Sequence, residues 1–212
     1  MIIHKDCYGT ILLVWAISLA AAFVFLRFIP WTFVSYLLTI IPMFFMGFVL
    51  YFFRVPKRQS VGEPNDVPAV ADGKIVVVDK VFEPEYLNSE CIQVSIYMDF
   101  FNVHVNFWPV SGEVKYYKYH PGKYMLAFLP KASELNEHTS TAISSPYGDV
   151  FFKQIAGTFA RRIVCYAVPG QNEEKGTECG IIKFGSRIDM YLPLDADIKV
   201  KLGDVVRGSE SV

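Results

Sequence analysis

Residues 181–193 read IIKFGSRIDMYLP, and this stretch indicates both the type of fold and the place to look for chemistry. Two strand-like runs, rich in β-branched and aromatic residues, flank the pair Gly185-Ser186. Small residues at such a point are typical of a turn or bulge between strands. The alternative is a self-processing site, in which the Ser186 hydroxyl attacks the Gly185 carbonyl. Taken alone, the tripeptide FGS (184–186) favours the turn.

Strand-like runs of the same kind recur from Ala69 onward, separated by turn residues. They are GKIVVVDKV (73–81), CIQVSIYM (91–98), GEVKYYKY (112–119), DVFFKQIAG (149–157), ARRIVCYAV (160–168), ECGIIKF (178–184), RIDMYL (187–192) and DIKVKL (197–202). They do not alternate with helical patterns as strands do in parallel α/β proteins. The sequence therefore predicts one mainly β (α+β) domain over residues 69–212.

The apolar residues, 52% of the chain, are concentrated near the N-terminus. From residue 11 to residue 53 the only charged side chain is Arg27, and the pair Pro30-Trp31 divides the stretch in two. The resulting segments, about 11–28 and 32–53, are each close to the roughly 20 residues that cross a bilayer. We expect a transmembrane helical hairpin within residues 1–55.

The basic residues at the ends of this region suggest how it is oriented. Lys5 precedes the first segment, and Arg54, Lys57 and Arg58 follow the second, which favours a cytoplasmic location for both ends. A cleaved signal peptide, a re-entrant hairpin and a buried helical pair remain alternatives. Residues 56–68, which contain three prolines and a glycine, read as a linker to the β domain.

Charge and cysteine usage argue against two classes of partner. The net charge is −1, from 20 basic and 21 acidic residues, so no nucleic-acid partner is expected. The cysteines, at positions 7, 91, 165 and 179, are far apart and form no CxxC pair. We expect them to be reduced, and we expect no metal site.

A serine nucleophile needs a nearby base and a group that orients the base. Of the four histidines, only His104 lies in a strongly apolar segment, MDFFNVHVNFWPVSG (98–112). Taken alone, His104 reads as a buried core histidine, and Asp72, in PAVADGKI, reads as a turn residue before a strand. Together with Ser186 they are the candidates for a self-processing site.

Taken in order, these segments resemble the short bacterial class of phosphatidylserine decarboxylase proenzymes. The resemblance runs from about Pro68 to Pro193, with a similar anchor ahead of it. The matching stretches are ADGKI, FNVHVN followed by PVSG, YHPGKY, AFLPKASELNEHT, QIAGTFARRIVC, PGQNEEKGTECG and FGSRIDMYLP. The resemblance implies a phosphatidylserine-decarboxylase-like β domain with a lipoyl-like hairpin region.

The resemblance also implies roles for four residues. Ser186 becomes the precursor of a pyruvoyl cofactor, Gly185 the residue before the cut, His104 the processing base, and Asp72 its orienting partner. Acyl transfer to the Ser186 oxygen, β-elimination and hydrolysis would leave the pyruvoyl group on the new N-terminus. The products would be a β chain of residues 1–185 and an α chain that begins at Ser186 and ends at residue 212.

The implied reaction converts phosphatidylserine into phosphatidylethanolamine and carbon dioxide through a Schiff base with the pyruvoyl group at Ser186. The substrate would lie in the cytoplasmic membrane of a bacterium, with the catalytic domain on the cytoplasmic side. Three basic residues are candidates for contact with the substrate phosphate: Arg161, Arg162 and Lys183. A solvated surface role is the simpler interpretation of all three.

This chain departs from the longer family members at one functional position. Those members carry a second histidine, implicated in decarboxylation, where this chain has Phe101. The proton donor is therefore open, with His104 as first candidate and His120, in YHPGKY, as second.

Two alternatives to this function remain. One is a decarboxylase of another serine lipid, of the archaetidylserine type. The other is a non-enzymatic membrane adaptor with a lipoyl-like domain, suggested by the spacing of Gly170, Gly176 and Gly180. The sequence also leaves a homo-oligomer open.

Overall fold

A computed structural model of the chain describes residues 2–125, 135–157, 162–183 and 186–212. The chain forms two compact units, residues 1–56 and residues 57–212. All but the first residue of the predicted linker, 56–68, belongs to the second unit. The division into anchor, linker and a self-cleaved catalytic domain stays a prediction.

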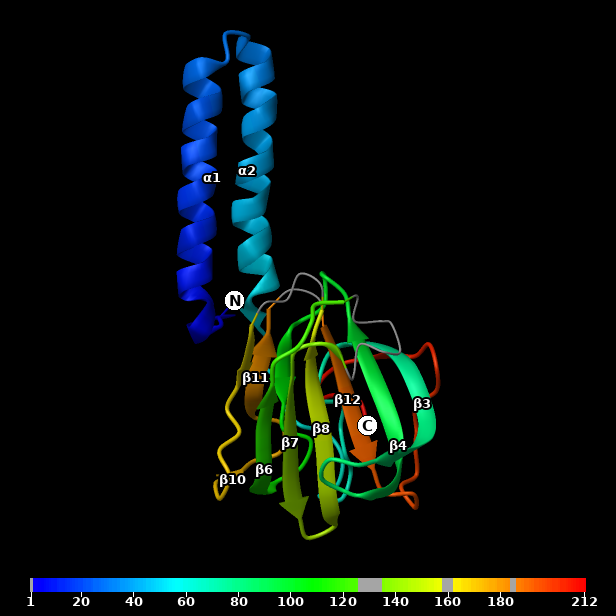
Figure 1. Ribbon diagram of the computed structural model, residues 1–212. Coiled ribbons are helices and arrows are strands. Elements are labelled where there is room, and N and C mark those ends of the chain that lie inside the picture. The colour runs from blue at the N-terminus through cyan, green and yellow to red at the C-terminus, as the bar shows by residue number, and fades with distance from the viewer. Residues whose placement is uncertain (1, 126–134, 158–161, 184–185) are drawn as a thin grey trace. The chain divides into compact units, whose positions relative to one another are not determined.

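The first unit is a hairpin of two helices, α1 (Tyr8–Phe28) and α2 (Thr32–Phe52), which lie side by side in Figure 1. Each has 21 residues, and at about 1.5 Å per residue each is about 31 Å long, close to the thickness of a bilayer core. Pro30 separates them, because the residue before a proline avoids the helical conformation. The Trp15 indole N–H donates to the Met46 carbonyl at 3.2 Å and ties the helices together. Both helices are long and apolar enough to cross a membrane.

Short elements close the open end of this hairpin. Strand β1 (Ile2–Ile3) pairs antiparallel with β2 (Arg54–Val55), and a 3-10 turn, Lys5–Cys7, leads into α1. The His4 N–H also donates to the Phe53 carbonyl at 3.0 Å. The segments before α1 and after α2 are therefore held together.

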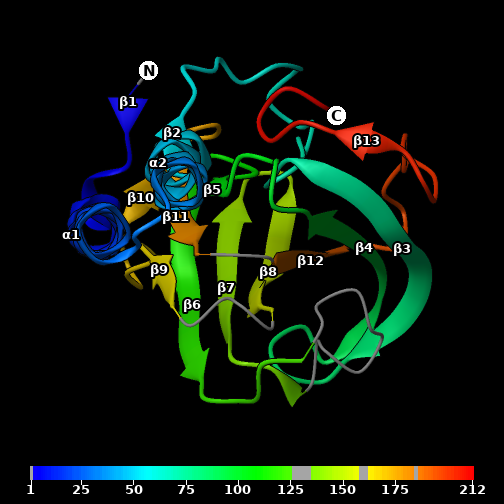
Figure 2. The same cartoon turned by 90° about the horizontal axis from the view of Figure 1, so that it is seen from above.

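The second unit contains an antiparallel sheet that curves into a half-barrel (Figure 2). In spatial order its eight strands are β10 (Asn172–Glu173), β6 (Gly112–His120), β7 (His138–Ser145), β8 (Gly148–Ala156), β12 (Ser186–Leu192), β4 (Ser89–Met98), β3 (Gly73–Glu83) and β13 (Val205–Val206). A smaller sheet has the order β5 (Val105–Phe107), β11 (Glu178–Ile182) and β9 (Ile163–Cys165). Strand β12 thus lies inside the larger sheet, between β8 and β4.

The two faces of β12 have different surroundings, because successive side chains of a strand point to opposite faces. Ile188, Met190 and Leu192 belong to the main hydrophobic core of the unit. Tyr191 belongs to a smaller apolar cluster on the other face. By the same alternation, the side chain of Ser186 points toward the main core.

The structure confirms the predicted mainly β fold preceded by a helical hairpin. One predicted strand is wrong: residues 197–202, DIKVKL, form no strand. Ile198 and Val200 instead pack against the main core, so the alternating pattern reflects one-sided burial without a partner strand. Strand β7, HTSTAISS, was not predicted, because its hydroxyl side chains obscure the hydrophobic pattern.

Candidate active site

Ser186 is fully buried at the first position of β12. Its backbone pairs with Met98 of β4 on one side and with Ala156 of β8 on the other. Its hydroxyl lies 3.7 Å from the Met98 sulfur, which is a weak acceptor. Gly185, the residue expected before the cut, lies outside the described residues. The expected cofactor residue is therefore held between two strands, away from solvent.

His104 is fully buried beside the end of β11. Its carbonyl accepts a hydrogen bond at 3.2 Å from the N–H of Ile182, and residues 183–185 alone separate Ile182 from Ser186. Ring atom Nδ1 lies 3.1 Å from the Asn102 carbonyl. A carbonyl oxygen accepts hydrogen bonds, so Nδ1 carries the proton and neutral His104 has its lone pair on Nε2. This is the tautomer that a base acting through Nε2 requires.

Asp72 precedes β3, and its carboxylate is held by Arg58 and Gly208. Arg58 Nη2 donates to Oδ2 at 2.8 Å, and Nη1 donates to Oδ1. The Gly208 N–H donates to Oδ1 at 2.9 Å. Within the described residues, none of the hydrogen bonds or ion pairs of Asp72 joins it to His104. Its orienting role stays a prediction, and the ion pair with Arg58 was missed because Arg58 lies in a stretch that reads as a linker.

A series of hydrogen-bonded, buried polar side chains leads to the Met98 sulfur. Asn106 Nδ2 donates to that sulfur at 3.9 Å, and Asn106 Oδ1 accepts from Gln154 Nε2 at 2.8 Å. Gln154 Oε1 in turn accepts from the Thr139 hydroxyl at 2.9 Å. A satisfied buried network of this kind is rigid, so it fixes the surroundings of the Ser186 hydroxyl. The sequence signal for this network is the presence of single polar residues, Asn106 and Gln154, within apolar strand runs.

A buried ion pair follows Ser186 on the opposite face of β12. Arg187 Nε lies 2.5 Å from Asp189 Oδ1, and Arg187 Nη2 donates to the Ser95 hydroxyl of β4 at 2.9 Å. The side chains of Arg187 and Asp189 are 2% and 0% exposed. The arginine after Ser186 thus fastens β12 to β4.

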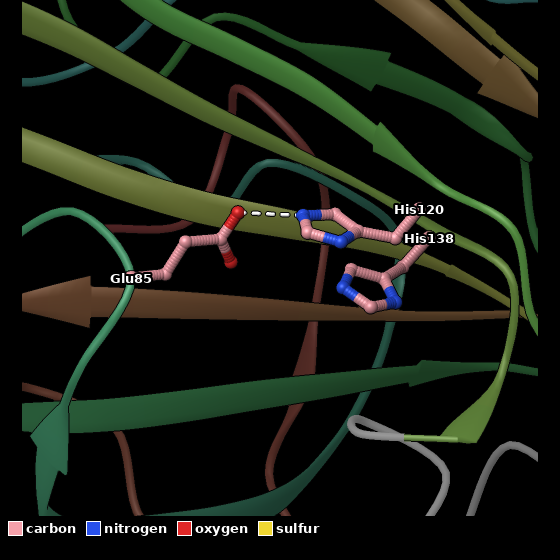
Figure 3. Close-up of side chains that lie close together, drawn as sticks. All are labelled: Glu85, His120 and His138. Atoms are coloured by element: carbon pink, nitrogen blue, oxygen red, sulfur yellow. Dashed lines mark hydrogen bonds and ion pairs between the residues drawn. The ribbon is translucent and has the colours of Figure 1, made fainter.

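His120, the second candidate for the proton donor, ends β6 in a cluster with Glu85 and His138 (Figure 3). His120 Nε2 lies 2.6 Å from Glu85 Oε1, and the two histidine rings stack with centroids 4.4 Å apart. Glu85 Oε2 accepts from the Ser140 hydroxyl at 2.9 Å and lies 3.0 Å from Lys153 Nζ. Burial by itself raises the pKa of Glu85, but the hydrogen bonds from Lys153 and His120 outweigh it and lower that pKa to about 2.

The remaining candidate residues lie in differing surroundings. Phe101, where the resemblance implies a histidine in the longer family members, is 66% exposed in the loop after β4. Arg162 is exposed, as expected of a solvated residue, whereas Arg161 lies outside the described residues. The expectation that Lys183 is a solvated surface residue is wrong. Lys183 is buried because it directly follows the inner strand β11.

Known proteins resemble this chain along its whole length. A phosphatidylserine decarboxylase proenzyme of Amoebophilus asiaticus is 49% identical over 165 residues, which cover 77% of this chain and 73% of the relative. Proteins of the same name from Cytophaga hutchinsonii and Porphyromonas gingivalis are 41% and 39% identical, over 100% of this chain and 97% of each relative. A family model described as phosphatidylserine decarboxylase matches residues 45–212. The chain belongs to the phosphatidylserine decarboxylase family.

Membership of the phosphatidylserine decarboxylase family confirms the resemblance inferred from the ordered segments. The matched region contains Ser186, His104 and Asp72. Because the family is one of enzymes, the alternative of a non-enzymatic membrane adaptor is set aside.

Proposed function

We propose that this chain is a phosphatidylserine decarboxylase proenzyme that cuts itself between Gly185 and Ser186. The mature protein then converts phosphatidylserine into phosphatidylethanolamine and carbon dioxide. Family membership supports the reaction. The observation that carries the proposal is the position of Ser186, a fully buried serine at the start of a central strand, with His104 hydrogen-bonded to the segment before it.

Self-processing begins when the Ser186 hydroxyl attacks the Gly185 carbonyl. A hydroxyl is a weak nucleophile at neutral pH, so His104 Nε2 takes its proton. The Gly185 acyl group passes from nitrogen to oxygen, and loss of the Ser186 α-proton then expels the Gly185 carboxylate. The dehydroalanine that remains is hydrolysed to a pyruvoyl group and ammonia. Asp72 is the residue proposed to orient His104.

The surroundings of Ser186 fit a pyruvoyl group. The group keeps the three carbons of the serine, so it needs no larger cavity than the fully buried side chain occupies. Its carbonyl supplies an electron sink for the loss of carbon dioxide. The buried network through Asn106 holds the neighbouring Met98 sulfur in place. His104 Nε2 is the proposed donor of the proton that replaces the carboxylate.

The strand order explains how two chains would stay together after the cut. Residues 186–192 form β12, which is hydrogen-bonded to β4 and β8 of the proposed β chain. Further along the proposed α chain, β13 pairs with β3. Gly208, also in the α chain, donates to Asp72 of the β chain. The α chain therefore remains part of the sheet.

The proposed substrate and the helical hairpin support a membrane location. The acyl chains of phosphatidylserine stay in the bilayer while its head group enters the site. The two apolar helices support membrane association, and the basic residues that flank them favour a catalytic unit on the cytoplasmic side of a bacterial membrane.

The proposed function is tested by the intact mass of the purified protein and by an assay with lipid vesicles. We expect two fragments that separate between Gly185 and Ser186, the smaller one blocked by a pyruvoyl group. We also expect carbon dioxide release from phosphatidylserine vesicles and far less from vesicles of archaetidylserine. A single uncut, inactive chain would contradict the proposal, and a preference for archaetidylserine would change the substrate.

Removal of the helical hairpin separates self-cutting from access to lipid. All described contacts of Ser186, His104 and Asp72 lie in the second unit, so a protein that lacks residues 1–56 keeps Arg58 and is expected to cut itself normally. Its activity on phosphatidylserine vesicles is expected to fall at least tenfold, while its activity on a short-chain, detergent-dispersed substrate is retained. Intact mass and the two assays check this. Loss of the cut would show that the hairpin helps to build the site.

Replacement of Arg58 is expected to destabilise the second unit. The side chains of Arg58 and Asp72 are 7% and 11% exposed, so Arg58→Ala leaves a carboxylate buried without its bidentate partner. Breaking a buried pair in this way costs about 3 kcal/mol. Thermal unfolding is the measurement, with Lys57→Ala as the control, because Lys57 is exposed next to Arg58. Equal melting temperatures for the two variants would contradict the expectation.

A further inference from the structure

Glu85, His120 and His138 come from three separate segments and place their side chains together. Glu85 lies in the turn between β3 and β4, His120 ends β6, and His138 begins β7. One ligand atom from each lies within 4.8 Å of the other two. Figure 3 shows both imidazole rings directed toward the carboxylate, each with its Nε2 on that side. Three ligand atoms this close together could hold one metal ion.

Neighbouring groups hold His138 and Glu85 in orientations that suit metal binding. His138 Nδ1 lies 2.8 Å from the Asn136 carbonyl, so Nδ1 carries the proton and Nε2 has the lone pair. The hydroxyls of Tyr116 and Ser140 donate to the Glu85 carboxylate at 3.2 and 2.9 Å. Such partners around the ligands are typical of metal sites.

The turn that carries Glu85 is itself fixed. The carboxylate of Glu83 accepts hydrogen bonds from the backbone N–H groups of Glu85, Tyr86 and Leu87 at 2.8 to 3.1 Å. Glu83 is 1% exposed, so these bonds are shielded from water. Glu85 is therefore presented to the histidines by a rigid turn.

The charges around the cluster favour a cation. Two carboxylates, those of Glu83 and Glu85, lie 3.2 and 3.0 Å from one ammonium group, that of Lys153. With neutral histidines this group has one net negative charge. The side chains of His120 and Glu85 are 24% and 14% exposed, so an ion can reach them from solvent.

We propose that Glu85 Oε1, His120 Nε2 and His138 Nε2 bind a divalent transition metal of the zinc class. Two imidazoles and one carboxylate suit zinc better than magnesium or calcium, which prefer oxygen ligands. Two ligands of one zinc ion lie roughly 3.3 Å apart, so the 2.6 Å hydrogen bond between Glu85 and His120 lengthens when the metal replaces the shared proton. The fourth position is taken by water.

The position of the cluster gives the metal a structural role. His138 pairs with Ile155 of β8, which pairs with Arg187 of β12. Paired residues share a face of the sheet, so the metal lies on the face opposite to the Ser186 side chain, two strands away. There it fastens the β3–β4 turn to β6 and β7.

Zinc binding to the untagged, EDTA-treated full-length protein tests this site. Isothermal titration with Zn²⁺ alone is expected to give one ion per chain, and saturating Zn²⁺ is expected to raise the melting temperature by about 5 °C. His120→Ala and His138→Ala are each expected to weaken binding at least 100-fold, while His4→Ala, which lies in the first unit, binds as the wild type does. No binding by the wild type, or unchanged binding in both cluster variants, would overturn the proposal.

Cobalt supplies a second readout that does not depend on how well the variants fold. Co²⁺ bound to the wild-type protein by imidazole and carboxylate is expected to show visible bands without a thiolate charge-transfer band. A thiolate band would assign the metal to cysteines and sink the cluster site. Intact mass of the same samples reports the cut at Ser186 separately, so the metal site and the proposed function succeed or fail independently.

Discussion

Ser186→Ala is expected to leave the full-length chain uncut and without decarboxylase activity. The substitution removes the nucleophile of the acyl shift and the oxygen that leaves in the elimination, so neither step has a substitute. The fold is expected to survive, because the hydroxyl contributes one weak hydrogen bond to the Met98 sulfur at 3.7 Å. Intact mass and carbon dioxide release from phosphatidylserine vesicles measure the two losses.

Ser186→Cys is the matched variant for this prediction. The thiol fills nearly the same volume and keeps a nucleophile, so partial cutting between Gly185 and residue 186 is expected. Melting temperatures of both variants separate a chemical effect from misfolding. Fragments of normal size from Ser186→Ala would show that another group makes the cut.

The parts of the fold that depend on local pattern could be predicted from the sequence. Two apolar runs separated by Pro30-Trp31 predicted α1 and α2, and most β-branched runs became strands. The missed strand and the wrongly predicted strand have different causes. Strand β7 was missed because its hydroxyl side chains obscure the hydrophobic pattern. Whether an alternating run such as 197–202 pairs with a neighbour depends on residues far away in the chain, and local pattern does not contain that information.

In the candidate site, too, local pattern identified single residues but could not predict which distant residues pair. Ser186 and His104 were found because apolar runs surround them and because the order of the motifs resembles a family. The pairing of Asp72 with Arg58 joins positions in a turn and in a linker-like stretch, neither of which carries a hydrophobic pattern. The cluster of Glu85 with His120 depends on the β3–β4 turn folding over the sheet, which no spacing in the sequence reveals.

His104→Ala is expected to slow self-cutting by about 100- to 10,000-fold, the usual contribution of a general base. His104 is tied through its carbonyl to Ile182, so its ring acts from a fixed place beside the segment that leads to Ser186. The nucleophile remains in this variant, so slow cutting is expected to continue over days, whereas Ser186→Ala shows none. A time course of intact mass after synthesis of the precursor measures the difference.

Misfolding is the competing explanation for slow cutting by His104→Ala, because the ring is fully buried and its loss leaves a cavity. The proper reference is the Ser186→Ala precursor, which is equally uncut and keeps the ring. The melting temperature of the double variant His104→Ala/Ser186→Ala, compared with that of Ser186→Ala, shows how much stability the ring itself contributes. If His104→Ala melts only a few degrees below Ser186→Ala and still cuts slowly, the ring acts on the chemistry. Cutting at the wild-type rate would instead remove His104 from the mechanism and leave the base to be found elsewhere around Ser186.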